Sequence, residues 1–341
     1  MGAPGAPMPF RQEAGGGRMA KKKELQYVHK TTFKHYMGRY WQFYAMMLLP
    51  LCYFILFKYV PMLGNILAFR HYKPLGGPYG DRWASAGKVW PAPLRYFEQF
   101  LLQPQFWSAF TNTLIISLEK LIITFPFPII FAILLNELRN LKVKKFVQTV
   151  SYVPRFVSTV VVISILSELL SPTTGMLNRV LDSLFSTGRP YYMNEPEYFR
   201  TLYIITEMWQ FTGWTAIIYL AVITGINSDM FEAARIDGAT RFQQIIYITI
   251  PTILPTIMVM FILNVGHLLS LGFEKVLLMQ SATNMSVSDI IDTYVYRYTL
   301  GSSSPQYSLG TAIGLFNGVI GLILVSSANF LSRKLTGNSI Y

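Results

Sequence analysis

Polar side chains recur at helical spacing inside apolar stretches of this 341-residue sequence. Glu207, Gln210 and Trp214 are three and seven positions apart, which places all three on one face of a helix. Such groups are costly to bury in hydrocarbon, so they indicate a functional pathway. Planar polar groups beside an aromatic face are what a hydroxyl-rich ligand needs. Three further candidates in two later stretches are Asn264, His267 and Asn317.

The same polar residues have two other interpretations. They could form hydrogen bonds between helices of this chain, in which case His267 is a packing residue rather than a ligand contact. Alternatively, the carboxylates of Glu168 and Glu207 could form a proton relay with the His267 imidazole. That interpretation favours a proton-coupled secondary transporter of a small polar solute.

No nucleotide-binding, metal-binding or catalytic motif accompanies these residues. A phosphate-binding loop needs Gly-x-x-x-x-Gly-Lys-Ser/Thr. Here Gly87-Lys88 is followed by Val89, and Arg82 occupies the position of the first glycine. The four histidines are scattered without metal-ligand spacing. We therefore expect no catalytic residue, no metal and no cofactor, and any ATP-driven activity would need a separate ATPase.

The composition is that of a protein that crosses a membrane several times. Hydrophobic residues make up 52% of the chain and charged residues 13%, whereas ordinary soluble domains are about 25% charged. A membrane-spanning helix needs about 20 mostly apolar residues. The third of six such stretches is the weakest, because Arg155 and Glu168 interrupt it. The stretches predict an all-α bundle of six transmembrane helices at 40–60, 108–136, 147–170, 201–226, 251–272 and 311–331.

The formal charge of +12 is distributed unevenly between the connecting segments. Segments on the side of both termini and of residues 227–248 hold 16 Lys and Arg in 82 residues, against 11 in 118 on the other side. The positive-inside rule then predicts cytoplasmic N- and C-termini in a cell membrane. No basic and aromatic patch remains to suggest nucleic acid as a partner.

The spans also predict the organisation of the chain. No secretory signal is visible, so the first span would direct insertion. Pro126 and Pro128 should kink the second span, and Gly310, Gly314 and Gly318 would let another helix approach the last span closely. The expected parts are a disordered or basic N-terminal segment at 1–38, the first span with an external loop at 39–107, a core membrane domain at 108–335 and a tail at 336–341.

The loop between the fourth and fifth spans is predicted to form two short helices. Asp229 and Glu232 have the spacing of a capping box that starts the first helix. Gly238 is the expected left-handed stop. Thr240 and Gln243 have the spacing of a second capping box, which would start the second helix.

The first of these loop helices has a surface suited to docking. Ala233 and Ala234 expose little bulk, so the helix could enter a cleft on a partner. The alternative is an amphipathic helix resting on the membrane, but such helices favour Lys and Arg, and three acidic residues occur here. Pro251 is expected to mark the end of the second loop helix, before the fifth span.

The loop sequence, E-A-A-x-x-D-G-A followed by I-x-I-P, resembles the EAA loop of the membrane subunits of type I ABC importers. In that family the loop is a coupling helix seated in a cleft of the cytoplasmic ATPase. The resemblance implies that Glu232, Ala233 and Ala234 face the ATPase, and that Asp237 and Gly238 shape the turn.

Other motifs resemble the subfamily that serves oligosaccharide and polysaccharide-fragment importers, including permeases for alginate or rhamnogalacturonan fragments. They are FKYVPM at 57–62, LLNELRN at 134–140 and DTYVYR at 292–297. The resemblance implies a permease subunit that forms half of a carbohydrate translocation pathway in a lipid membrane. It implies four kinds of partner: a second related permease, two ABC ATPase subunits, an extracytoplasmic solute-binding protein and an oligosaccharide substrate. Arg155 departs from the family, where a histidine is expected.

Two further possibilities remain open at this point. The aromatic segment 189–200 could meet the solute-binding protein or anchor at the membrane interface. A membrane-anchored receptor or scaffold is a third class of function, in which transport would not depend on this chain.

Overall fold

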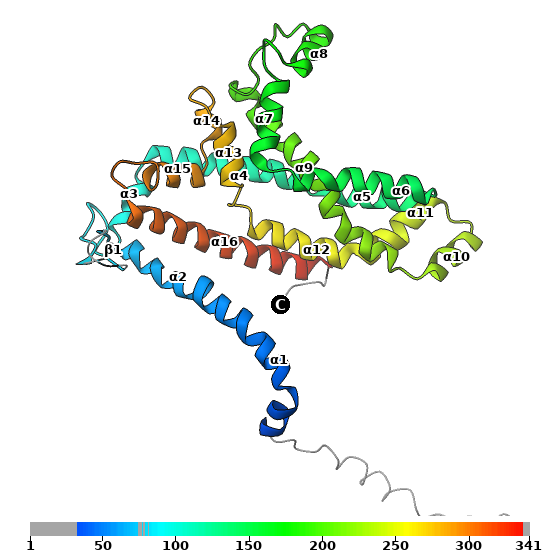
Figure 1. Ribbon diagram of the computed structural model, residues 1–341, viewed down its shortest axis with the longest axis horizontal. Coiled ribbons are helices and arrows are strands. Elements are labelled where there is room, and N and C mark those ends of the chain that lie inside the picture. Colours follow the sequence, from blue (N-terminus) through cyan, green and yellow to red (C-terminus); the bar gives the residue numbers. More distant parts are fainter. Residues whose placement is uncertain (1–32, 74–76, 78, 81, 337–341) are drawn as a thin grey trace, which may run out of the picture. The chain divides into compact units, whose positions relative to one another are not determined.

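The protein is almost entirely helical in a computed structural model that describes residues 33–73, 77, 79–80 and 82–336 (Figure 1). Within that part, the only strands are two of two residues each, and the predicted all-α fold is confirmed. Residues 1–32 of the predicted N-terminal segment and 337–341 of the predicted tail lie outside the described residues.

Four helices in the described part are long and apolar enough to cross a membrane, and six spans result if each of two bent helix pairs counts as one. These four correspond to the first, second, fifth and sixth predicted spans. They are Gly38–Phe69, Pro104–Glu137, Arg241–Gly266 and Tyr307–Lys334.

Residues 33–63 belong to a compact unit separate from the rest of the chain. Its helix α1 (Phe33–Phe54) bends at Tyr40, where φ is −118° and ψ is 18°. The helix continues through the π-helical turn η2 (Ile55–Tyr59) into α2 (Val60–Met62). None of the most apolar stretch of this span is buried, as expected for side chains that face hydrocarbon.

Residues from Gly64 onward form the second compact unit. The 3-10 helix η3 (Leu63–Phe69) leads into β1 (Arg70–His71), which pairs with β2 (Arg82–Trp83) in antiparallel register. The short helix α3 (Arg95–Leu101) follows.

The second span is a pair of helix segments in line. Helix α4 (Pro104–Thr124) and helix α5 (Pro126–Glu137) are separated only by Phe125. Pro126 lacks the N–H that a continuous helix would need at that position. The prolines therefore interrupt the helix where the sequence predicts, and the two segments still form one 34-residue span.

The third predicted span, 147–170, is not one straight helix. Helix α6 (Leu141–Tyr152) with the 3-10 turn η4 (Val153–Phe156) meets helix α7 (Thr159–Leu169) at 100°. Pro154 lies in the turn, Val157 is extended, and the Ser158 side chain caps α7 by accepting a hydrogen bond from Val161 N. A proline turn followed by a new N-cap starts a second helix in a new direction.

The fifth span begins earlier and ends earlier than predicted. Helix α11 (Arg241–Gln244) runs through the π-helical turn η5 (Ile245–Thr249) into α12 (Ile250–Gly266). Pro251 does not separate a loop helix from the span, because the helix continues past it, with the wider π-helical turn η5 directly before the proline. His267, with φ of −98° and ψ of 12°, ends the helix five residues before position 272.

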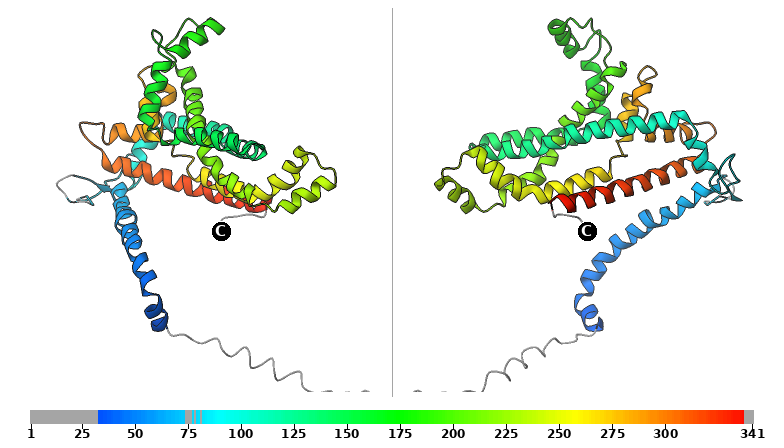
Figure 2. Two further views of the ribbon diagram at one scale, coloured as in Figure 1. Left: turned by 45° about the vertical axis from the view of Figure 1, so that its right-hand side comes forward. Right: turned by 180° about the vertical axis from the view of Figure 1, so that it is seen from behind.

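The remaining helices complete the second unit. The fourth span is α9 (Pro196–Thr224), and the helix after it, α10 (Ser228–Ile236), is bent from it by 69°. Helices α12 and α16 run side by side (Figure 2). The others are α8 (Met176–Phe185), α13 (Phe273–Met279), α14 (Met285–Ser288), α15 (Ile291–Tyr298) and α16 (Tyr307–Thr336).

Two aromatic side chains of neighbouring helices are part of the core. Phe100 of α3 and Phe106 of α4 are fully buried, with ring centroids 4.6 Å apart. Phe316 of α16 lies within 6 Å of both ring centroids. Helices α3, α4 and α16 therefore pack around one aromatic cluster.

Close helix contact occurs at Gly213 but not along the whole predicted glycine stripe. A Cβ at Gly213 would lie 2.2 Å from the carbonyl oxygen of Ser151, so α9 and α6 can touch only because this residue has no side chain. Gly310 is similarly close to Thr299. At Gly314 and Gly318 a Cβ would meet nothing within 4 Å, so no other helix of the described part of the chain packs closely there.

A buried carboxylate organises the loop before α3. Glu98 accepts hydrogen bonds from three backbone N–H groups, at 2.8 Å from Lys88, 3.0 Å from Val89 and 2.9 Å from Trp90. A Cβ at Gly87 would lie 1.8 Å from the carboxylate, so only glycine fits beside it. The hydrogen bond from Trp90, followed by those from its neighbours, keeps the pKa of Glu98 below its usual value, although burial acts in the opposite direction.

We predict that Glu98→Gln weakens this loop, because an amide offers one acceptor oxygen in place of two. Hydrogen exchange at the three bound amides should speed up roughly tenfold. Since the folded-state pKa of Glu98 is lowered, its stabilisation is complete above the unfolded pKa and is lost as pH falls through the folded value. Exchange measured across an acid pH series should show this step in the wild type and not in the variant.

The matched control for this experiment is Glu197→Gln, which changes an exposed carboxylate at the start of α9. Exchange at the three loop amides should be unchanged in the control. Equal exchange rates in Glu98→Gln and the wild type would show that the carboxylate does not hold the loop.

Candidate functional site

Glu207 lies at the centre of a buried cluster of charges. Its side chain joins two lysines from different elements: Lys120 Nζ of α4 lies 2.8 Å from one carboxylate oxygen, and Lys275 Nζ of α13 lies 3.0 Å from the other. Glu207 is 8% exposed, so its carboxylate is buried in the protein. A buried carboxylate requires such pairing, because an isolated charge would not remain buried.

The two lysines differ in how far they reach the surface. Lys275 is 4% exposed and its ammonium lies 5.1 Å from the centre of the Tyr203 ring. The Tyr203 hydroxyl in turn donates to the carbonyl oxygen of Leu271. The Lys120 side chain is 32% exposed. Lys275 is thus held inside the protein, whereas Lys120 is partly open.

Sequence reasoning missed both lysines. Lys275 lies in a segment predicted to be an external loop, and its return to the helix bundle is a tertiary effect. Lys120 could have been found, because Glu119 and Lys120 form an isolated charged pair inside the apolar stretch 108–136. Charges within a span indicate a functional site by default.

A small polar cavity of about 70 Å³ opens beside Lys120. Asn264 and His267 line it from the end of α12, as their predicted common face requires. The Asn264 amide donates to the carbonyl oxygen of Met260 at 2.8 Å, which leaves its side-chain oxygen able to accept. The other polar lining residues are Ser117, Thr124 and Ser270.

Gln210 and Trp214, although on the same helix as Glu207, meet a different element. Gln210 is 3% exposed and its amide donates to the carbonyl oxygen of Val157 at 3.0 Å, at the bend between η4 and α7. Trp214 is half-exposed and meets Phe156 edge-on, with ring centroids 5.6 Å apart. The broken third span therefore brings an aromatic pair next to a buried amide.

Asn317 lies apart from these groups. It is half-buried in α16, and its side-chain oxygen has no hydrogen-bond partner among the described residues. It does not line the cavity that contains Asn264 and His267.

The proton relay considered from the sequence is not assembled in the described part of the chain. Glu168 accepts a hydrogen bond from Thr174 at 2.8 Å and lines a separate cavity of about 430 Å³ with Tyr191. Glu207 is engaged by two lysines, and within the described residues no hydrogen bond or ion pair joins Glu168, Glu207 and His267.

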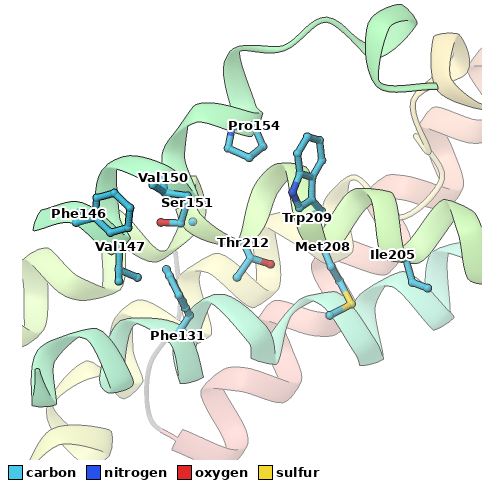
Figure 3. A pocket seen from close by; sticks show the side chains of 11 residues that line it. Phe131, Phe146, Val147, Val150, Ser151, Pro154, Ile205, Met208, Trp209 and Thr212 are labelled. Carbon is cyan, nitrogen blue, oxygen red and sulfur yellow. The ribbon is translucent and has the colours of Figure 1, made fainter. Parts of the chain in front are cut away.

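A larger cavity of about 560 Å³ lies between α5, α6 and α9 (Figure 3). Its walls are mainly apolar, with Phe131, Phe146 and Met208 among them, and Trp209 stands at one side. An apolar hollow of this kind suits another helix or a lipid chain and not a hydroxyl-rich solute.

The loop after α9 has the two-helix form predicted from the sequence, with one change. Asn227, and not Asp229, caps α10, since its side-chain oxygen accepts from Asp229 N at 3.0 Å. The predicted Asp229–Glu232 capping box is therefore wrong: the helix starts two residues earlier, because Asn is itself a strong N-cap. The Thr240–Gln243 capping box is confirmed, with both of its reciprocal hydrogen bonds present.

The turn between the two loop helices depends on Gly238. Its φ of +80° is in the left-handed region that other residues rarely adopt, which confirms the predicted stop. Glu232, Ala233 and Asp237 are exposed, and Ala234 is partly covered. Ile236 is 87% exposed, an unusual position for so large an apolar side chain.

A helical membrane protein with buried ion pairs, polar cavities within its spans and a capped helix projecting from one end has the features of a multi-pass transport protein. Residues 124–337 match the family described as binding-protein-dependent transport system inner membrane component. The chain belongs to this family of permease subunits of the inner membrane, and it is accordingly a transport subunit and not an enzyme.

Two curated relatives from Bacillus subtilis are similar over most of their length. The polygalacturonan/rhamnogalacturonan transport system permease protein YteP is 43% identical over 87% of this chain and 89% of its own. Protein LplB is 38% identical over 87% of this chain and 90% of its own.

Solved structures show the same fold. A chain of a bacterial ABC transporter that imports the acidic polysaccharide alginate matches with a TM-score of 0.77 and 37% identity, over 88% of this chain and 98% of that one. A second structure, the alginate transporter in complex with an alginate pentasaccharide-bound periplasmic protein, matches with a TM-score of 0.77 and 36% identity, over 89% and 98%.

We predict that Gln210→Ala weakens solute uptake by about tenfold, since the substitution removes the buried hydrogen bond to Val157 O and frees the bend of the third span. Asn264→Ala should reduce uptake to a similar extent by removing a polar group from the cavity lining. Uptake is measured in membrane vesicles, with assembly checked by size-exclusion chromatography.

The control for both variants is Gln105→Ala, which changes an exposed residue at the start of α4 that does not line this cavity. Wild-type uptake kinetics in Gln210→Ala and Asn264→Ala would remove both residues from the proposed solute path.

Proposed function

We propose that this chain is the permease subunit of an ATP-driven oligosaccharide importer. It works with a second related permease, two cytoplasmic ATPase subunits and an extracytoplasmic solute-binding protein, and it forms half of the path through the membrane. The support is its family, its similarity to a polygalacturonan/rhamnogalacturonan permease and its similarity to an alginate transporter crystallised with a periplasmic protein.

The orientation follows from charge. Both termini and the loop that contains α10 lie in the cytoplasm, because these segments together with residues 137–146 hold 16 Lys and Arg in 82 residues against 11 in 118 on the other side. This places α3 and α15, at the opposite end of the second unit from α10 (Figure 1), on the outer face.

Coupling to the ATPase is assigned to α10 and the turn after it. The observation that carries this proposal is that α10 is held firmly at both ends yet is hardly covered. Asn227 caps its start and Gly238 ends the turn, but none of its residues is buried and Ile236 is 87% exposed. A rigid helix with an exposed apolar residue has the form of a surface that a partner covers.

Within that surface, Glu232, Ala233 and Ala234 face the ATPase cleft, and Asp237 and Gly238 set the turn. ATP-driven closure of the two ATPase subunits then displaces the loop. Since α11 continues without a break into the fifth span, the displacement reaches the membrane part and changes which side has access to the solute path.

The solute path is assigned to the polar groups along α9, the end of α12 and α16: Glu207, Gln210, Trp214, Asn264, His267 and Asn317. The Trp214–Phe156 pair offers an apolar ledge for a sugar face, and the cavity beside Asn264 and His267 offers hydrogen-bonding groups.

We predict that Glu232→Lys reduces uptake by at least about tenfold. A cleft that receives a carboxylate has a positive potential, so it strongly repels a lysine at the same position. The same variant should insert into the membrane in normal amounts and leave ATP hydrolysis without response to the loaded binding protein. Uptake and ATPase activity are measured on the complete importer in proteoliposomes.

Lys142→Glu is the matched control, since it reverses an exposed charge at the start of α6, outside the loop. It should transport normally. Normal uptake by Glu232→Lys would exclude α10 as the coupling element.

A further inference from the structure

The buried charge cluster around Glu207 does not balance. Two ammonium groups, those of Lys120 and Lys275, share a single carboxylate. The cluster therefore carries one net positive charge inside a membrane-embedded bundle, where an uncompensated charge is expensive.

The other acidic residue nearby does not supply the missing negative charge. Glu119, next to Lys120 in sequence, pairs with Arg200 at 3.7 Å. In the described part of the chain, the ionic contacts to Lys120 and Lys275 come from Glu207 alone.

The excess charge is accessible at one place. Lys275 is 4% exposed and does not line the cavity, whereas Lys120 lines it and is 32% exposed. Lys120 has three donors on its ammonium, and the contact with Glu207 uses one of them. The remaining donors are free to bind an acceptor in the cavity.

The cavity is of a size and chemistry that fit a carboxylate. Its volume of about 70 Å³ holds a few waters, or one carboxylate with a water, but no sugar ring. Asn264, His267 and Ser270 bring further polar groups to the same space. A charge-assisted hydrogen bond from an ammonium to a carboxylate is about twice as strong as a neutral one.

We propose that Lys120 is a specificity residue whose uncompensated charge receives a carboxylate of an acidic oligosaccharide, a chain of uronate sugars, during its passage. This inference rests on the proposed function and narrows its substrate class. The sugar ring stays outside the cavity, which is too small for it, while its carboxylate enters beside Asn264 and His267. Glu207 and Lys275 do not contact the ligand. Their pairing determines how much of the Lys120 charge remains uncompensated.

The test compares two ligands with the same sugar backbone: a galacturonic acid trimer, which carries three carboxylates, and its trimethyl ester, which is neutral. Their binding is measured on the assembled transporter in lipid nanodiscs, without the solute-binding protein. The wild type should prefer the acid by at least about tenfold. Lys120→Gln should remove that preference with little change for the ester, and Lys120→Arg should retain it.

Two further variants separate charge balance from simple contact. Lys275→Met leaves Glu207 to neutralise Lys120, so the preference for the acid should fall although residue 275 does not reach the cavity. Glu207→Gln adds to the net charge, so the preference should rise. If Lys120→Gln fails to assemble, these opposite changes in the preference for the acid still test the role of the charge on Lys120.

A wild-type transporter without preference for the acid overturns the inference, whether it binds both trimers equally or neither. A preference that survives Lys120→Gln overturns it as well. The proposed function is tested separately by measuring uptake with the binding protein present. A wild-type importer that carries neither trimer nor any neutral oligosaccharide counts against oligosaccharide import. Uptake with a preference for the acid that does not depend on Lys120 counts only against this inference.

Discussion

The arrangement of the membrane-embedded part depends on how one buried carboxylate is neutralised. Glu207 can remain 8% exposed only because α4 and α13 each bring an ammonium to within 3.0 Å of it. Those contacts hold α13, in the segment between the fifth and sixth spans, against α4 and α9. In the same region the Tyr203 hydroxyl donates a hydrogen bond to the carbonyl oxygen of Leu271. Because the pairing must persist in a low-dielectric interior, the position of α9 relative to α4 is constrained at this point. The cavity lined by Asn264 and His267 lies beside the same lysine.

Much of the helix content was predictable, because it follows from local chemistry. Apolar length identified four spans directly, the prolines at 126 and 128 marked an interruption, and the Thr240–Gln243 box and Gly238 gave the ends of helices in the loop. The errors arose where two local rules competed. Asn227 and Asp229 are both of a residue type that caps helices, and Asn227 is the one at the start of α10. The 100° bend in the third span needed the turn at Pro154 and the cap at Ser158 to be read together.

The candidate site was only partly predictable, and the reason is that sequence periodicity describes one helix at a time. Spacing correctly placed Asn264 and His267 on one face, which lines a cavity. It could not show that Glu207 and Gln210, neighbours on α9, contact different elements, one paired with lysines and the other bonded to Val157. Nor could it bring Lys275 to Glu207 from a different segment. Contacts between distant segments are set by packing, for which one sequence holds no direct signal.

The continuity of the fifth span has a mechanical meaning. From Arg241 to Gly266 the chain is one helix without a break, including the π-helical turn η5, and 26 residues at 1.5 Å each make a rod of about 40 Å. One end of the rod follows the hinge at Gly238, and the other carries Asn264 next to the cavity. Since a helix resists compression, a small tilt at the Gly238 turn displaces the far end of the rod sideways. The rod therefore acts as a lever that is moved from the loop.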